Sequence, residues 1–312
     1  MQPKDDRDAI LQALVAACAA GGLDEVRRLA NEAELSEADA DSYSLLEGSC
    51  AVDDVQIVQW FVAYFGYANK SARLRRLVWV ASANGSLRVA QWLVGQLGLG
   101  GADARAMGNV ALCHACAGGH LEFARWLVAA LAITTADLRA NHNYVLREAC
   151  GNGHLAVAQW LTATFGLGPA DARSGHNDAL FSACRRGYLA VVQWLAATFG
   201  LGPADARSCN NEALRAACRG GQLAVAQWLA ATFGLTAADA RACNNEALRF
   251  VCANGHLEVA QWLVDTLGLG LADFQDRSPD NSGVSAAQEA CEHPALSQWL
   301  AARWPSLGAP AE

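Results

Sequence analysis

The sequence predicts an all-α fold, a helical repeat solenoid of about nine helix-pair units. One observation is the decapeptide NGHLEVAQWL at residues 254–263, which has close copies along the chain, such as NGHLAVAQWL at 152–161. A second is a column of tryptophans at intervals of 32, 34, 34, 34, 34, 34 and 37 residues. A period near 34 is typical of stacked repeats, because each unit buries its apolar face only against its neighbours. The column comprises Trp60, Trp92, Trp126, Trp160, Trp194, Trp228, Trp262 and Trp299.

The whole chain, 1–312, is predicted to form a single repeat domain. A degenerate N-terminal cap repeat occupies 8–40, where Arg28 stands at the tryptophan position. Seven central repeats occupy 41–277, and a degenerate C-terminal cap repeat follows at 278–312. Terminal repeats commonly depart from the pattern because one of their faces meets water.

Each repeat is predicted to hold two helices, as residues 203–234 illustrate. A short first helix, ALRAACR, ends at a glycine pair, since glycine can adopt the left-handed conformation at a helix C-terminus. A second helix follows from about Gln222 to Phe233, with apolar residues at helical spacing. An asparagine precedes the first helix in five of the repeats, and we expect its side chain to cap that helix by accepting from first-turn amides. These residues are Asn109, Asn143, Asn177, Asn211 and Asn245.

The segments between repeats carry a helix-start signature. An aspartate recurs every 34 residues, and a glycine or threonine stands three positions before it. Proline follows that glycine directly at Pro169 and Pro203. A cap residue, proline at the first helical position and an acid at the third indicate a short helical turn. The aspartates are Asp103, Asp137, Asp171, Asp205, Asp239 and Asp273.

Most of the eleven cysteines share one repeat position, ten residues before the tryptophan position. Equivalent residues of stacked helices lie roughly 8–10 Å apart, which is too far for a disulfide. We therefore expect small buried apolar residues in a reducing compartment, either cytoplasmic or nuclear. The column comprises Cys18, Cys50, Cys116, Cys150, Cys184, Cys218 and Cys252.

The net charge of −8 argues against a nucleic-acid partner or a membrane surface, and no apolar run is long enough to span a bilayer. The repeat core, G-H-L-x-V-A-x-W-L preceded by A-L-x-x-A-C, resembles the ankyrin repeat over about residues 8–304. Two elements differ from that family: N-x-A-L replaces T-P-L-H, and the capped linker replaces the β-hairpin finger. The resemblance implies a non-catalytic protein–protein interaction scaffold, whose partner binds on a concave groove lined by the first helices.

The cysteines, histidines and tryptophans that suggest metal, catalytic or ligand sites are each interpreted as structural residues. Cys113 and Cys116 form a lone C-x-x-C, whereas structural zinc needs four converging ligands. Histidines 120, 154 and 256 recur with the repeat, so we expect them to bond neighbouring backbone carbonyls. The tryptophans are interpreted as a packed or half-buried ladder. No set of nucleophile, base and orienting residue is evident, and we expect neither an enzyme nor a cofactor.

The candidate partner site consists of residues that vary while the repeat frame stays constant. In the ankyrin family such groove positions flank the cysteine column. Arginine and aromatic residues gather there in the sixth to eighth repeats, a composition typical of binding hot spots, and they suggest an acidic partner segment. The alternative is a solvated basic edge that complements helix C-termini. The candidates are Arg185, Arg186, Arg215, Arg219, Arg249, Phe250, Phe181, His114, Glu148 and Asn152.

Two other functions stay open at this point. The chain could be a substrate-recruiting adaptor for a larger assembly such as a ubiquitin ligase, although both ends are occupied by degenerate repeats and leave little room for a docking module. It could also be a structural, self-assembling solenoid whose end repeats stack on one another. For the scaffold we expect a monomer that binds another protein.

Overall fold

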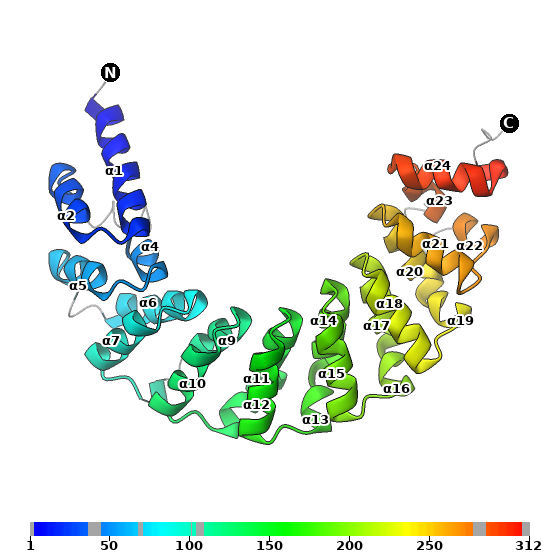
Figure 1. Ribbon diagram of the computed structural model, residues 1–312, viewed down its shortest axis with the longest axis horizontal. Helices are drawn as coiled ribbons and strands as arrows, with labels where there is room; N and C mark the ends of the chain where they lie inside the picture. The colour runs from blue at the N-terminus through cyan, green and yellow to red at the C-terminus, as the bar shows by residue number, and fades with distance from the viewer. Residues whose placement is uncertain are drawn as a thin grey trace. The chain divides into compact units, whose positions relative to one another are not determined.

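The computed structural model describes residues 3–36, 45–67, 71–100, 102–103, 109–276 and 285–307. Over these ranges its regular elements are helices, and no β-strand is present (Figure 1). The predicted repeat boundaries at 40/41 and 277/278 lie outside the described residues. The helices form two compact units, residues 1–140 and 141–312, which we call the N-terminal and C-terminal blocks.

The N-terminal block contains the first four helix pairs. Within it, first helices pack against neighbouring first helices, and second helices against second helices. Each pair is joined by a tight turn at a left-handed residue, such as Gly21 at φ 77° and Gly85 at φ 72°. The pairs are α1 (Pro3–Ala20) with α2 (Leu23–Glu32), α4 (Leu45–Ala51) with α5 (Val55–Tyr64), α6 (Ser71–Asn84) with α7 (Leu87–Leu97), and α9 (Val110–Ala117) with α10 (Leu121–Ala130).

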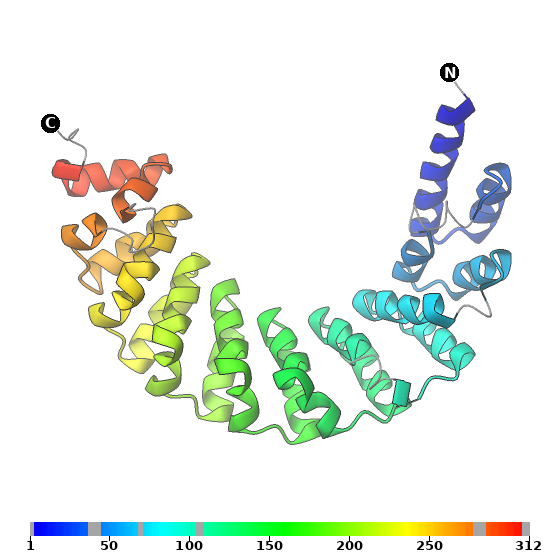
Figure 2. The same cartoon turned by 180° about the vertical axis from the view of Figure 1, so that it is seen from behind.

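The C-terminal block contains the remaining five pairs in the same arrangement, except that the first turns of α11 precede its boundary at residue 141; Figure 2 shows the helices from behind. The described ranges thus hold nine helix pairs, as the sequence predicts. The pairs are α11 (Thr135–Gly151) with α12 (Leu155–Phe165), α14 (Ser174–Arg186) with α15 (Leu189–Phe199), α17 (Ser208–Arg219) with α18 (Leu223–Phe233), α20 (Ala242–Ala253) with α21 (Leu257–Asp265), and α23 (Ala286–Ala290) with α24 (Pro294–Arg303). A 3-10 turn, η2 (Pro305–Leu307), follows.

Short helices link the repeats, as predicted, in place of β-hairpin fingers. They are α13 (Pro169–Ala172), α16 (Pro203–Ala206), α19 (Ala237–Ala240) and α22 (Leu271–Gln275). In each, the aspartate at the third helical position accepts a hydrogen bond from the backbone N–H of the cap residue, at 2.8–2.9 Å. The aspartate therefore satisfies an amide that the helix itself leaves unpaired.

Three of these aspartates also accept from an arginine of the preceding repeat, a contact that the sequence did not reveal. Arg173 donates to Asp205 at 2.7 Å, Arg207 to Asp239 at 2.8 Å, and Arg241 to Asp273 at 2.7 Å. Each guanidinium donates to both carboxylate oxygens, the two-point geometry that planar arginine favours. We call these three pairs the linker clamps.

The predicted role of the asparagine column is wrong. Asn143, Asn177 and Asn245 each end a run of three residues with positive φ, a left-handed turn that separates the linker from the first helix. Their side-chain amides donate into the next repeat, for example from Asn177 to the Ser208 hydroxyl at 2.9 Å. No side-chain capping bond is made by Asn109, which instead donates to the carbonyl of Asp137. Asparagine suits this position because its short polar side chain tolerates the left-handed region.

The core follows the predicted columns. Every cysteine of the column is buried and free, and Ser82, which replaces cysteine in the third repeat, is buried and donates to the carbonyl of Val78. The tryptophans are half-buried, apart from the buried Trp262. Several ring contacts run along a single second helix, as between Trp194 and Phe199 at 5.5 Å, whereas Phe274 of α22 contacts Trp299 of α24 at 6.3 Å. Within the described ranges, no helix combines the length and apolarity that crossing a bilayer requires.

Candidate partner-binding site

Three first helices of the C-terminal block carry an acidic residue directly after the left-handed turn. These residues are Asp178 on α14, Glu212 on α17 and Glu246 on α20, spaced 34 apart. A carboxylate at this end of a helix is favourable, because the unpaired amides give the N-terminus a partial positive charge. The acidic column is the counterpart of the arginines that lie further along the same helices.

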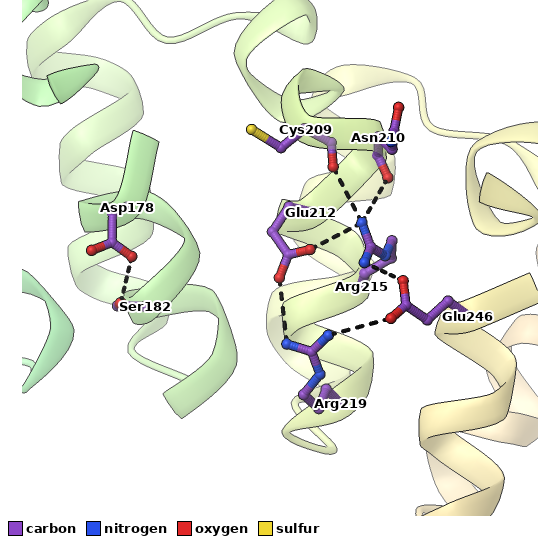
Figure 3. A network of polar contacts seen from close by, with 8 residues as sticks. All are labelled: Asp178, Ser182, Cys209, Asn210, Glu212, Arg215, Arg219 and Glu246. Atoms are coloured by element: carbon purple, nitrogen blue, oxygen red, sulfur yellow. Dashed lines mark hydrogen bonds and ion pairs between the residues drawn. The ribbon is translucent and has the colours of Figure 1, made fainter. Parts of the chain in front are cut away.

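Arg215 is at the centre of an ion-pair network between α17 and α20 (Figure 3). It is only 9% exposed, and its guanidinium lies 3.0 Å from Glu212 and pairs with Glu246. It also donates to the carbonyl oxygens of Cys209 and Asn210, at 3.2 and 3.4 Å. Its terminal nitrogens are therefore engaged within the protein rather than offered to a partner.

Arg219, two turns after Glu212, is held from several sides. Its guanidinium lies 3.5 Å from Glu212 and 3.8 Å from Glu246 (Figure 3). The same guanidinium sits over the ring of Phe250, 3.9 Å from the ring centroid. Such a cation–π contact adds to the two ion pairs. We call the surface between α17 and α20, where these side chains meet, a channel. In this channel the charge of Arg219 is neutralised by the two glutamates and its flat face is covered by the Phe250 ring.

Arg185 stands one repeat before Arg219 and differs from it. Its side chain is exposed and makes no ion pair within the described part of the chain. Its neighbour Arg186 is also exposed but donates to the side-chain oxygen of Asn152. Asp178, on the same helix, accepts from Arg147 at 2.7 Å. Arg185 is therefore a cation that the described repeats around it do not neutralise.

A hollow of about 340 Å³ lies between α14 and α17. Its lining includes Phe181, Ser182 and Ala216. It also includes Asp178 and Glu212, which directly follow the left-handed turns of α14 and α17, and Arg185 and Arg219, which lie in the last turns of the same helices. The small side chains of Ser182 and Ala216 leave the space open, since the equivalent residue in the next repeat is Phe250.

A family model described as ankyrin repeats (3 copies) matches residues 77–171 and again 146–239. Together these matches cover 77–239, just over half of the 312 residues. The chain belongs to the ankyrin-repeat family. A comparison with curated proteins found no significant match. Ankyrin repeats generally act as non-catalytic modules for protein–protein interaction.

The candidate residues are distributed unequally over the ankyrin repeats. The structure brings Arg185, Arg219 and Phe181 together at the hollow, and Phe250 stacks on Arg219 in the next channel. Other candidates lie elsewhere on the first helices: Glu148 and Asn152 near the end of α11, Arg249 half-buried on α20, and His114 exposed on α9 in the N-terminal block.

Sequence reasoning missed Asp178, Glu212 and Glu246, although they decide which arginines are paired. Their signal was present, because each directly follows the asparagine column at the 34-residue period. Acidic residues are common in the first turn of any helix, so a recurring acid at this position does not by itself indicate an ion pair with the next repeat.

The histidines and cysteines of the frame have structural roles. His120 donates to the carbonyl of Ala83 at 2.9 Å, and His256 to that of Arg219 at 3.2 Å, as predicted. His293 makes the same contact with Ala253 at 2.8 Å. Burial raises the pKa of the Cys218 thiol to about 12, so it stays protonated and unreactive at neutral pH. Among the residues described, no group of His, Cys, Asp or Glu side chains is placed to hold a metal ion.

Proposed function

We propose that this ankyrin-repeat protein is a non-catalytic scaffold that binds a partner protein on the first-helix face of α14, α17 and α20. The observation that carries the proposal is Arg185, an exposed guanidinium without an ion pair among the described residues. The equivalent arginine of the next repeat has two carboxylates and a ring around it. Because the repeats neutralise Arg219 but leave Arg185 without a counter-charge among the described residues, an external acidic partner is favoured for Arg185.

The linker side is a poor candidate for the same role. Its aspartates and arginines are committed to one another through the linker clamps. These contacts repeat without change, whereas residues of the first-helix face differ from repeat to repeat. A surface that selects one partner must carry side chains that vary while the frame stays constant.

The charge of the open arginine indicates an acidic segment of the partner. A guanidinium presents donors in a planar fork that matches a carboxylate. Arg186 adds a second exposed guanidinium at the end of α14, where positive charge is also favoured by the helix terminus. We further propose that binding takes place in a reducing compartment, the cytoplasm or nucleus, where the free thiols of the cysteine column are stable.

Charge reversal at Arg185 tests the proposal. In affinity capture from cell lysate followed by mass spectrometry, Arg185→Glu should lose the proteins that the unchanged chain retains. Thermal unfolding should shift only slightly, because Arg185 has no ion pair to lose among the described residues and a reversed charge in the last turn of α14 costs about 1 kcal/mol. The matched control is Arg125→Glu, an exposed arginine on the second helix α10 that pairs with Glu122 of the same helix. If Arg185→Glu retains the same proteins as Arg125→Glu, the assignment of this face is wrong.

A further inference from the structure

Two adjacent channels on the first-helix face can be compared position by position, because they are related by the repeat. Moving back 34 residues converts Arg219 into Arg185 and Phe250 into Ala216. The same step converts the acidic pair Glu212 and Glu246 into Asp178 and Glu212. The channel between α17 and α20 therefore shows which groups surround an arginine at this repeat position when its contacts are complete.

The filled channel contains one ring and two carboxylates around its arginine. The Phe250 ring centroid lies 3.9 Å from the guanidinium carbon of Arg219. The carboxylates of Glu212 and Glu246 lie 3.5 and 3.8 Å from the same guanidinium. Ring stacking and charge pairing act on different parts of a guanidinium, the flat face and the edge, so both can be satisfied together.

The channel between α14 and α17 lacks the ring, and its two carboxylates pair with arginines other than Arg185. Ala216 takes the place of the ring and leaves the hollow of about 340 Å³. Asp178 is engaged by Arg147 at 2.7 Å, and Glu212 is engaged by Arg215 and Arg219. Arg185 consequently has neither a ring on its face nor a carboxylate at its edge among the described residues.

We propose that the hollow between α14 and α17 accepts an aromatic side chain of the partner, with a neighbouring carboxylate of the same segment bound to Arg185. The inference rests on the proposed function and names the partner's recognition element: an aromatic residue next to Asp or Glu. The ring takes the place that Phe250 occupies one repeat later, against Phe181 and Ala216.

Size and charge restrict what the hollow accepts. Its volume is near the lower end of the range for ligand pockets, roughly 300–1,000 Å³, which suits one aromatic side chain with its adjoining backbone. Asp178 and Glu212 line the end opposite Arg185, so an acidic group at that end meets like charge. The acidic residue of the partner therefore lies on the Arg185 side of the aromatic residue.

The decisive variant is Ala216→Phe, which supplies the ring from within the chain as Phe250 does in the next repeat. We would select peptides that bind the full-length protein from a random heptapeptide phage library. The selected peptides would then be synthesised and their dissociation constants measured by fluorescence polarisation. The selected peptides should share an aromatic residue beside Asp or Glu. Their affinity should fall at least about tenfold for Ala216→Phe and for Arg185→Gln, because about 1.4 kcal/mol corresponds to tenfold.

The matched control is Ala231→Phe, which adds the same ring at an exposed position of the second helix α18, outside the hollow; it should bind the selected peptides as the unchanged protein does. Thermal unfolding would show that Ala216→Phe remains folded. Selection of no peptides, selection of peptides without the aromatic–acidic pair, or equal binding by Ala216→Phe would each overturn the proposal.

An exposed thiol provides an independent readout of position. Cys209 lines the hollow and is exposed, and Cys243 holds the same position one repeat later. Bound peptide should slow alkylation of Cys209 by iodoacetamide at least threefold and leave Cys243 unaffected, as followed by mass spectrometry. Equal protection of both thiols, or protection of neither, would place the peptide outside the hollow and contradict the proposal.

The lysate experiment separates this inference from the function on which it rests. If Arg185→Glu loses the captured proteins and Ala216→Phe retains them, the first-helix face binds the partner but the hollow does not take its side chain. If both variants retain them, the proposed function itself is wrong. Loss with both variants supports the two together.

Discussion

The linker side and the first-helix side of the C-terminal block use the same chemistry in opposite ways. On the linker side, Arg173, Arg207 and Arg241 each clamp the aspartate of the next repeat, at 2.7, 2.8 and 2.7 Å. On the first-helix side, Arg215 bridges two glutamates, whereas Arg185 has no ion pair among the described residues. The repeated contacts on the linker side determine how neighbouring repeats stack. The variation on the first-helix side leaves particular side chains free of partners within the described part of the stack.

The comparison shows that period alone does not separate structural from functional residues. Both faces are built from positions 34 residues apart, and both carry arginine and carboxylates. What distinguishes them is whether each charged group finds its partner within the stack. Removal of a paired group should therefore destabilise the stack, and by more where the pair is buried, which the following experiments measure alongside the packing that both faces share.

Gly220→Ala should have the largest effect, because it tests how closely neighbouring first helices approach in the frame that both faces share. A Cβ atom at Gly220 would lie 1.8 Å from the carbonyl oxygen of Arg185, a backbone atom that cannot move alone. We expect a loss of about 3 kcal/mol in the free energy of unfolding, measured by urea denaturation.

Gly200→Ala is the control for this change. Gly200 has φ 61°, but a Cβ atom added there would meet no other atom within 4 Å, so only backbone strain of about 1 kcal/mol is expected. Equal losses for the two variants would show that the close approach of α14 and α17 is not a constraint.

Arg215→Ala and Arg207→Ala compare the two faces directly. Loss of the buried Arg215 leaves Glu212 and Glu246 facing each other without its charge between them (Figure 3). We expect it to cost about 2–3 kcal/mol in the free energy of unfolding, less than for a fully buried pair. Arg207 is 39% exposed, and its removal should cost about 0.5–1 kcal/mol. A larger loss of unfolding free energy for Arg207→Ala than for Arg215→Ala would show that the linker side, not the first-helix side, contributes more to stability.

Acid should weaken the linker clamps with a small but defined effect. Hydrogen bonds from Arg173 and Arg241 lower the pKa values of Asp205 and Asp273 in the folded protein. Their stabilisation is therefore fully present above the unfolded-state pKa of about 3.9 and is lost as pH falls through the lower folded values. The melting temperature should be nearly constant from about pH 7 to 5 and should fall below about pH 4.

The double variant Asp205→Asn, Asp273→Asn provides the reference, since neither amide titrates. Its melting temperature, followed by circular dichroism, should be lower at neutral pH and should decline less steeply in acid. An unchanged acid slope would mean that other carboxylates account for the whole effect.

The sequence predicted the features that repeat. The helix pairs, the capped linker turns and the buried cysteine column each depend on one residue type at one position, and a column of identical residues reveals them. The contact of His120 and His256 with a preceding carbonyl was predictable for the same reason. In these cases local chemistry and period point to the same structure.

The features that depend on two columns were not predicted. Whether Glu212 pairs with Arg215, Arg219 or a partner depends on side-chain reach and on competing groups in the adjacent repeat. The hollow depends on two small side chains, Ser182 of α14 and Ala216 of α17, which both line it. The asparagines were misassigned because residues that favour helix caps also tolerate left-handed backbone, and only the φ values near 60° separate the two roles.

The bonds between repeats have a consequence for how this chain folds and how it yields to force. They join residues between 27 and 40 positions apart, from Arg173 with Gly200 to His293 with Ala253. Closing loops of this size costs little entropy, so one formed repeat can template the next without waiting for distant segments. Because each repeat contacts only its neighbours, tension applied at a terminus should release repeats in succession from the pulled end.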